Sequence, residues 1–222
     1  MLTIESGGRA IKPGDDFVLY ARAEDDWYEK AQLVQATDAK YRRGALPMEV
    51  VYTHDGFLSD AEKQIGFVGV HLNLNGQPKV LVPTDVMTLP KKGIEGSLKI
   101  GLVGAEDSRI APSVVEQHVT AVDLPGISGW VAPNSFDTND LRKPTQLESC
   151  LAIRAIGQLD ELSYMHYPIE LKDIKDDWAI NNFSGARNVW HGAPVLSERD
   201  GRLCGVLFVE SKRVWVERIP DL

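Results

Sequence analysis

The sequence predicts an all-β fold, because short β-rich segments recur along its 222 residues and turn signals separate them. Helical periodicity is weak: residues 24–41 can be read as a helix, but Trp27-Tyr28 and the flanking segments favour strands there. Many short strands at regular spacing indicate barrels or sandwiches rather than alternating β-α-β units. The turn signals are dipeptides that favour a reversal of the chain: Asp55-Gly56, Asn75-Gly76, Pro125-Gly126 and Asp200-Gly201.

Segments rich in aliphatic and aromatic residues mark the expected strands. In chain order they span residues 17–20, 49–52, 67–74, 79–82, 98–103, 114–122, 150–156, 193–196, 203–209 and 213–218. Polar stretches at 58–64 and 134–145 divide these strands into groups. We therefore expect an N-terminal β module at residues 1–60 and a larger unit at 61–222, with halves at 61–135 and 145–222.

The charge balance disfavours a nucleic-acid partner. The chain carries 32 acidic and 24 basic residues, a net charge of −8, whereas phosphate backbones are bound mainly by Lys and Arg. No apolar run approaches the roughly 20 residues that cross a bilayer. The first residues also lack the basic and apolar stretches of a secretory signal. We expect an intracellular protein, cytoplasmic or nuclear, that binds no membrane.

The two cysteines, Cys150 and Cys204, lie in apolar strand-like segments, which predicts two buried, reduced thiols. Without a CxxC motif or further cysteines, they cannot make a tetrahedral zinc site. Four single histidines lack metal-ligand spacing and are expected on the surface or satisfied in the core. They are His54, His71, His118 and His166. We expect no metal and no cofactor.

The most informative segment lies near the C-terminus. Residues 189–196 read VWHGAPVL, and a hairpin turn leads from them into residues 201–207, GRLCGVL. This arrangement resembles the nucleophile segment of the trypsin-like serine proteases, Gly-Asp-Ser-Gly-Gly-Pro-Val followed by a hairpin and Gly-x-Leu-x-Gly-Val. The resemblance implies that His191 occupies the serine position. Val189 then occupies the position of the glycine whose N–H contributes to the oxyanion hole.

Residues 66–86, GFVGVHLNLNGQPKVLVPTDV, resemble the first hairpin of the same family, Gly-x-Gly-Val, a turn, and Val-Leu-Thr-Ala-Ala-His-Val. In that alignment Asp85 stands at the general-base histidine. The strand-like residues 119–127 correspond to the segment that carries the family's aspartate, which places Asp123 there. The resemblance covers residues 66–220 and implies a trypsin-like double β-barrel.

These positions imply a degenerate triad. A Ser-His-Asp site needs a hydroxyl nucleophile, an imidazole that takes its proton and a carboxylate that orients the imidazole. With His191 and Asp85 at the first two positions, neither role is filled, and a β-branched Val189 disfavours the backbone geometry of the oxyanion donor. We expect Asp85 and His191 to meet in the groove between the barrels. The alternative is that Asp85 is a turn residue and His191 a surface histidine.

The N-terminal module resembles a Tudor-type, SH3-like barrel. The segments PGDDFVLYAR (13–22), DDWYEKAQLV (25–34) and MEVVYTHDGF (48–57) follow the family's strand order. The resemblance implies an aromatic cage for methylated lysine or arginine, which binds by cation–π attraction. Its walls would be Tyr20, Tyr28 and Tyr52, with Asp55 as the acidic rim and Phe57 as a further member. The alternative is that these aromatic residues only pack the strands.

Three functions are compatible with these residues. The favoured one is a non-catalytic binding or scaffold protein, a pseudoenzyme whose groove accepts an extended protein or peptide partner, basic or methylated, by edge-strand pairing. The second is an active peptidase or other hydrolase with an unconventional nucleophile, namely Ser184, Cys204 or His191. The third is a β-rich structural subunit of a larger complex.

Overall fold

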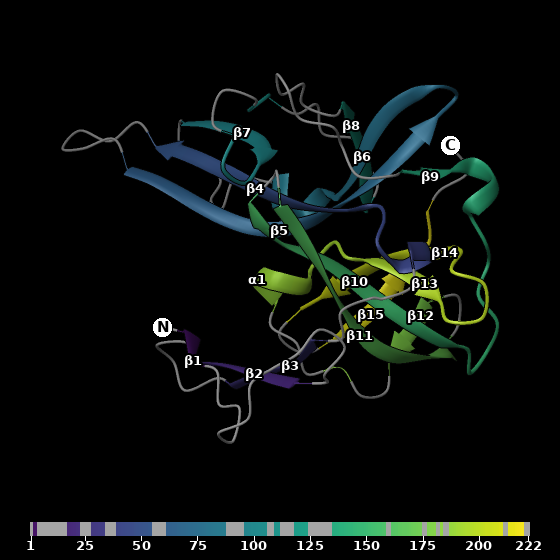
Figure 1. The fold of residues 1–222 in the computed structure, drawn as a ribbon. Helices are drawn as coiled ribbons and strands as arrows, with labels where there is room; N and C mark the ends of the chain where they lie inside the picture. The colour runs from purple at the N-terminus through teal and green to yellow at the C-terminus, as the bar shows by residue number, and fades with distance from the viewer. Residues whose placement is uncertain are drawn as a thin grey trace.

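The computed structural model is built almost entirely from β-strands arranged in three sheets (Figure 1). It describes residues 2–3, 17–22, 28–33, 39–54, 61–87, 96–105, 109–111, 118–123, 135–158, 161–174, 177–180, 183, 187–210 and 213–219. The all-β prediction is therefore confirmed. Within the described residues, no helix has the length and apolar character needed to cross a membrane.

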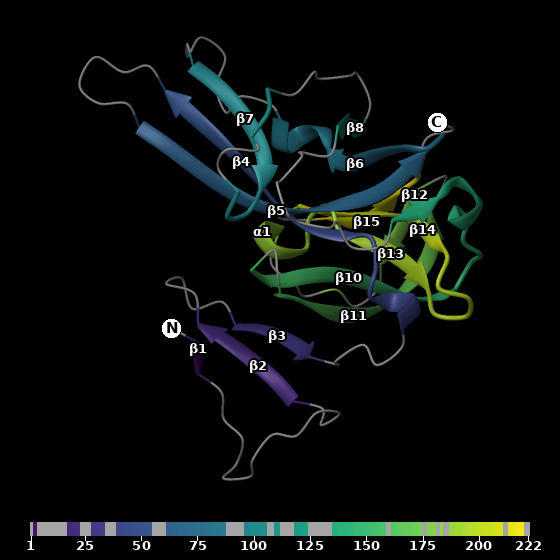
Figure 2. The same ribbon diagram turned by 45° about the horizontal axis from the view of Figure 1, so that its top comes forward.

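The N-terminal sheet has three antiparallel strands, β1 (Leu2–Thr3), β2 (Phe17–Arg22) and β3 (Tyr28–Leu33), in the order β1-β2-β3. Strand β3 confirms the strand interpretation over the helical one, with a short 3₁₀ turn, η1 (Ala39–Tyr41), further along the chain. Figures 1 and 2 both place this sheet beside β11 of the C-terminal barrel.

The second sheet forms the first half of the predicted double barrel. Its hydrogen-bonded order is β7-β4-β5-β6-β8, and β9 pairs in parallel with β5. The strands are β4 (Ala45–His54), β5 (Ala61–Leu74), β6 (Gln77–Pro83), β7 (Gly96–Leu102), β8 (Val119–Asp123) and β9 (Phe136–Asp137). Asn75 and Gly76 join β5 to β6 with φ of 53° and 81°, the left-handed pair that a two-residue hairpin with an Asn-Gly turn requires.

Strand β4 corrects the expected domain boundary. Residues 45–54, which the sequence assigns to the N-terminal module, pair with β5 along the whole of β4 and with β7 on its other side. The sheet of the first barrel therefore begins before residue 60, at β4. The reason is the apolar face of β4, which is buried in that sheet's core through residues such as Leu46, Met48 and Val50.

The C-terminal half is a closed barrel of six strands in the order β10-β11-β12-β15-β14-β13. They are β10 (Ser149–Gln158), β11 (Glu161–Ile174), β12 (Asp177–Ile180), β13 (Pro194–Ser197), β14 (Leu203–Val209) and β15 (Val214–Glu217). All residues of β13 and β14 are buried, so these strands form the centre of the core. Closure gives each of these six strands a hydrogen-bonded neighbour on both sides.

The two halves pack directly against each other (Figure 2). One continuous cluster of buried side chains includes Val68 and Leu81 of the first half and Trp190 and Val206 of the second. The backbone N–H of Val68 also donates a 2.9 Å hydrogen bond to the carbonyl of His191. The segment that carries His191, which follows the one-turn helix α1 (Arg187–Trp190), is thereby fixed against β5.

Candidate active site

Asp85 and His191 meet where the two halves join. Asp85 lies in the 3₁₀ turn η2 (Thr84–Met87), directly after β6, and His191 lies between α1 and β13. The His191 Nε2 is 2.9 Å from the Asp85 Oδ1. This is the contact that the alignment predicts across 106 positions of sequence, and the structure contains it.

The His191 ring is held by both of its nitrogens. The backbone N–H of Val209 donates to Nδ1 over 3.1 Å, so Nδ1 acts as an acceptor and the ring proton lies on Nε2, facing Asp85. The side chain is only 2% exposed, and its ring packs edge-on against Phe208 with centroids 5.0 Å apart. Because no lone pair is left for a reactant, His191 serves to position the Asp85 carboxylate.

A cavity of about 410 Å³ opens beside this pair. Its lining is mainly apolar and consists of Val50, Tyr52, Ile65, Gly66, Phe67 and Val86, with Asp85 and His191. The Tyr52 hydroxyl donates to the Val86 carbonyl over 2.7 Å. Burial, together with the negative charge of Asp85, raises the pKa of that hydroxyl, so it remains protonated. The Asp85 side chain is 37% exposed and can be reached from the cavity by water or a ligand.

A second imidazole lies on the other side of Thr84. The backbone N–H of Thr84 donates to the carbonyl of His118 over 2.8 Å, which places His118 next to the turn that carries Asp85. The His118 ring also faces Phe208, with centroids 6.4 Å apart. Its Nδ1 is 3.0 Å from Oε2 of Glu217 on β15. Sequence reasoning missed this pair because 99 positions separate its members and neither belongs to a recognisable motif.

The position expected for the triad aspartate is not in the site. Asp123 ends β8, is 80% exposed and forms an ion pair with Lys79 at the start of β6. The antiparallel register places Val119, not Asp123, opposite Pro83 at the Asp85 end of β6. The residue that lies opposite Thr84, next to Asp85 in the chain, is therefore the one before β8, His118.

Val189, expected at the oxyanion position, lies in α1 and packs half-buried against the barrel core. Its backbone is therefore helical.

The residues expected for an aromatic cage are distributed over different parts of the molecule. Tyr20 and Tyr28 belong to β2 and β3, whose backbones pair with each other. Tyr52 belongs to β4 in a different sheet and lines the cavity beside Asp85. Asp55 and Phe57 lie outside the described residues. The cage remains a prediction for the N-terminal sheet.

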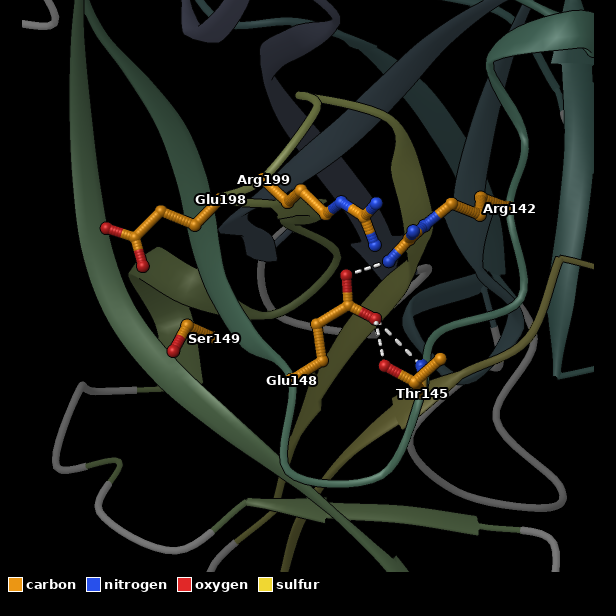
Figure 3. Close-up of a pocket in the computed structure, with 6 residues that line it drawn as sticks. All are labelled: Arg142, Thr145, Glu148, Ser149, Glu198 and Arg199. Carbon is orange, nitrogen blue, oxygen red and sulfur yellow. Dashed lines mark hydrogen bonds and ion pairs between the residues drawn. The ribbon is translucent and has the colours of Figure 1, made fainter.

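A separate charged pocket of about 350 Å³ lies near the turn between β13 and β14 (Figure 3). It is lined by Arg142, Thr145, Glu148, Ser149, Glu198 and Arg199. Arg142 forms an ion pair with Glu148, whose other oxygen accepts bonds of 2.7 and 3.0 Å from the N–H and hydroxyl of Thr145. Arg142 also lies 3.4 Å from a carboxylate oxygen of Asp200. These charges compensate one another inside the pocket.

Both thiols are buried beneath that pocket, as predicted. A hydrogen bond between them, together with burial, raises the pKa of Cys150, while the same bond and the Arg142 charge lower the pKa of Cys204. Among the described residues, Cys150, Cys204 and Glu148 form the only group of three potential metal ligands. Three ligands fall short of a tetrahedral structural site, and Arg142 already supplies a cation there.

The other two nucleophiles considered from the sequence are Ser184 and Cys204. Ser184 lies outside the described residues. Cys204 is buried near the start of β14, whereas His191 contacts Val209 at its end. Five residues of extended strand span roughly 17 Å. Cys204 therefore belongs to the charged pocket and not to the junction.

Comparison with solved structures identifies the fold as a chymotrypsin-like double β-barrel. A tobacco etch virus protease with a cysteine-to-alanine substitution matches with a TM-score of 0.50 at 12% identity, over 83% of this chain and 77% of that chain. The tobacco vein mottling virus protease matches with a TM-score of 0.49 at 14% identity, over 85% of this chain and 83% of that chain. A catalytically active tobacco etch virus protease in complex with product matches with a TM-score of 0.47 at 14% identity, over 83% of this chain and 77% of that chain. No protein-family model matches the chain, and neither does any curated protein sequence.

These matches correct the favoured functional prediction. The sequence predicted a non-catalytic scaffold and a pseudoenzyme, whereas the solved structure that matches this fold with a TM-score of 0.50 is a tobacco etch virus protease. The prediction was wrong because it took the absence of a serine and a histidine at the positions of His191 and Asp85 to mean that the protein has no catalytic activity. A sequence identity of 12–14% to these structures supports a shared fold only. The activity of this chain is therefore proposed separately below.

Proposed function

We propose that this protein is a peptidase of the chymotrypsin-like fold that cleaves polypeptide at the junction of its two halves. One observation carries the proposal: a partly exposed carboxylate, Asp85, is held by a buried imidazole, His191, beside an apolar cavity at that junction. An ionisable side chain that is fixed by a buried partner and faces a cavity is the usual signature of a functional site.

The chemistry of the junction favours water as the attacking group. His191 has both ring nitrogens occupied, and Tyr52 donates its proton to a backbone carbonyl while burial raises the pKa of its hydroxyl. The hydroxyls of Thr84 and Thr120 bond to each other over 2.8 Å. A carboxylate can instead accept a hydrogen bond from a water molecule and orient it towards a carbonyl carbon. Asp85 takes this role.

The cavity indicates the kind of residue that the enzyme accepts beside the scissile bond. Its walls include Val50, Ile65, Phe67 and the ring of Tyr52, with Asp85 at one side. An apolar side chain can be buried there, and each buried methylene contributes about 0.8 kcal/mol. An acidic side chain would be repelled by Asp85. The expected substrates are therefore extended peptides with an apolar residue next to the cleaved bond.

Digestion of a peptide library, read out by mass spectrometry, tests this function. The wild-type protein is expected to cleave beside apolar residues, and Asp85→Asn is expected to lower the rate by about 10²-fold, the order of loss that a misplaced reactant causes. Asp123→Asn is the matched control, since Asp123 is an exposed carboxylate away from the junction. Absence of cleavage by the wild-type protein, or an undiminished rate in Asp85→Asn, would overturn the proposal.

A further inference from the structure

The carboxylate–imidazole pair formed by His118 and Glu217 has the geometry of a general base. Its Nδ1–Oε2 separation is 3.0 Å, and Nδ1 carries the proton when it donates to the Glu217 carboxylate. The lone pair of the neutral ring is then on Nε2. A carboxylate that fixes the tautomer in this way is the arrangement by which an imidazole is prepared to take a proton. His118 is 72% exposed, so its ring can be reached by a substrate or by water.

Glu217 is held in place independently of His118. The indole Nε1–H of Trp215 donates to the same Glu217 oxygen over 3.0 Å. Trp215 is buried in the barrel core and packs against Phe208, with centroids 5.1 Å apart. Glu217 itself is only 23% exposed. The carboxylate is therefore anchored to the barrel, which distinguishes it from a freely moving surface side chain.

The pair is connected to the Asp85 site at two points. Phe208 lies against both imidazoles, with ring centroids 6.4 Å from His118 and 5.0 Å from His191. The carbonyl of His118 also accepts the backbone N–H of Thr84, the residue before Asp85. The backbone of His118 is therefore bonded to the turn η2, and the two imidazoles share Phe208 as a neighbour. Within the described residues, of these two rings only that of His118 keeps a nitrogen without a hydrogen-bond partner.

We infer that His118 is the proton acceptor of the hydrolysis and that Glu217 is a positioning residue acting through it, an inference that rests on the peptidase function proposed above. The water held by Asp85 gives its proton to His118 Nε2 while its oxygen forms a bond to the carbonyl carbon. The carbonyl electron pair moves onto the oxygen and returns as the C–N bond breaks. The His118 imidazolium then donates the same proton to the leaving amine, so the ring ends neutral and no further reactant is consumed.

Steady-state kinetics on a cleaved library peptide test this inference. His118→Gln is expected to lower kcat by ~10²–10⁴-fold with KM little changed, and added imidazole is expected to restore part of the rate. Glu217→Gln should lower kcat by a smaller factor, again with KM unchanged, because the ring remains but its tautomer is no longer fixed. Glu210→Gln, an exposed carboxylate at the end of β14, is the control and should match the wild type.

The outcomes separate this inference from the function on which it rests. If Asp85→Asn is inactive while His118→Gln keeps the wild-type kcat, the assignment of His118 is wrong and the peptidase function stands. If the wild-type protein cleaves nothing, both fail together. Acylation of histidines by diethyl pyrocarbonate gives a readout without substrate. His118 should be modified faster than buried His191, and equal rates for the two would contradict the accessible Nε2.

Discussion

At the scale of single residues, the role of a histidine here is decided by which of its nitrogens is occupied. His191 accepts the N–H of Val209 and donates to Asp85, so it is a fixed support. His118 donates through Nδ1 to Glu217 and keeps Nε2. Residue type alone does not distinguish these roles, and neither histidine stands at the position the family would give it. The hydrogen-bond partners supply the distinction.

Gly192 allows the segment that carries His191 to approach β5 closely. Its φ is 88°, and a Cβ at this position would overlap the backbone oxygen of Val68. Gly192→Ala is therefore expected to destabilise the protein by more than the ~1–2 kcal/mol that a left-handed conformation costs an L-residue. Urea unfolding of the two proteins measures the difference.

Gly76→Ala is the matched control, since Gly76 has a φ of 81° but a Cβ added there would meet no described atom within 4 Å. It should show the conformational cost alone. Equal losses of unfolding free energy in Gly192→Ala and Gly76→Ala would mean that the close approach to Val68 contributes nothing.

At the scale of elements, the first-barrel sheet is tied together by an ion pair in its interior. Glu49 on β4 is 1% exposed, and Arg109 donates to its Oε1 from two nitrogens, over 2.8 and 3.0 Å. A backbone bridge between Ile100 and Ile110 fixes the same segment to β7. The ion pair and the bridge together attach residues 109–111 to β4 and β7.

Arg109→Met is expected to lower the free energy of unfolding by ~3–5 kcal/mol, because it removes the Arg109 cation from the buried Glu49 carboxylate. Adding Glu49→Gln to that variant should recover much of the loss, since the buried negative charge is then removed. Chemical denaturation of the two single variants and the double variant measures the coupling. Simple additivity of the two single losses would contradict an interaction between these side chains.

At the scale of the whole molecule, local sequence patterns predicted strands, turns and fold class, and the alignment predicted that Asp85 and His191 would meet. The boundary before β4 was missed because strand pairing between distant segments is not encoded in a local pattern. The same is true of His118, which the register of β8 places opposite Thr84, in the turn that carries Asp85. The role of Glu217 depends on closure of the C-terminal barrel, which no short segment reveals.

The central claim is that the junction of the two halves is where peptide is bound and cleaved. A crystal structure of the Asp85→Asn protein with a peptide from the library tests it most directly. We expect the peptide to cross the junction, with an apolar side chain in the cavity lined by Tyr52 and Phe67 and a backbone carbonyl beside position 85. A peptide bound only elsewhere, for example in the charged pocket at Arg142, would contradict it.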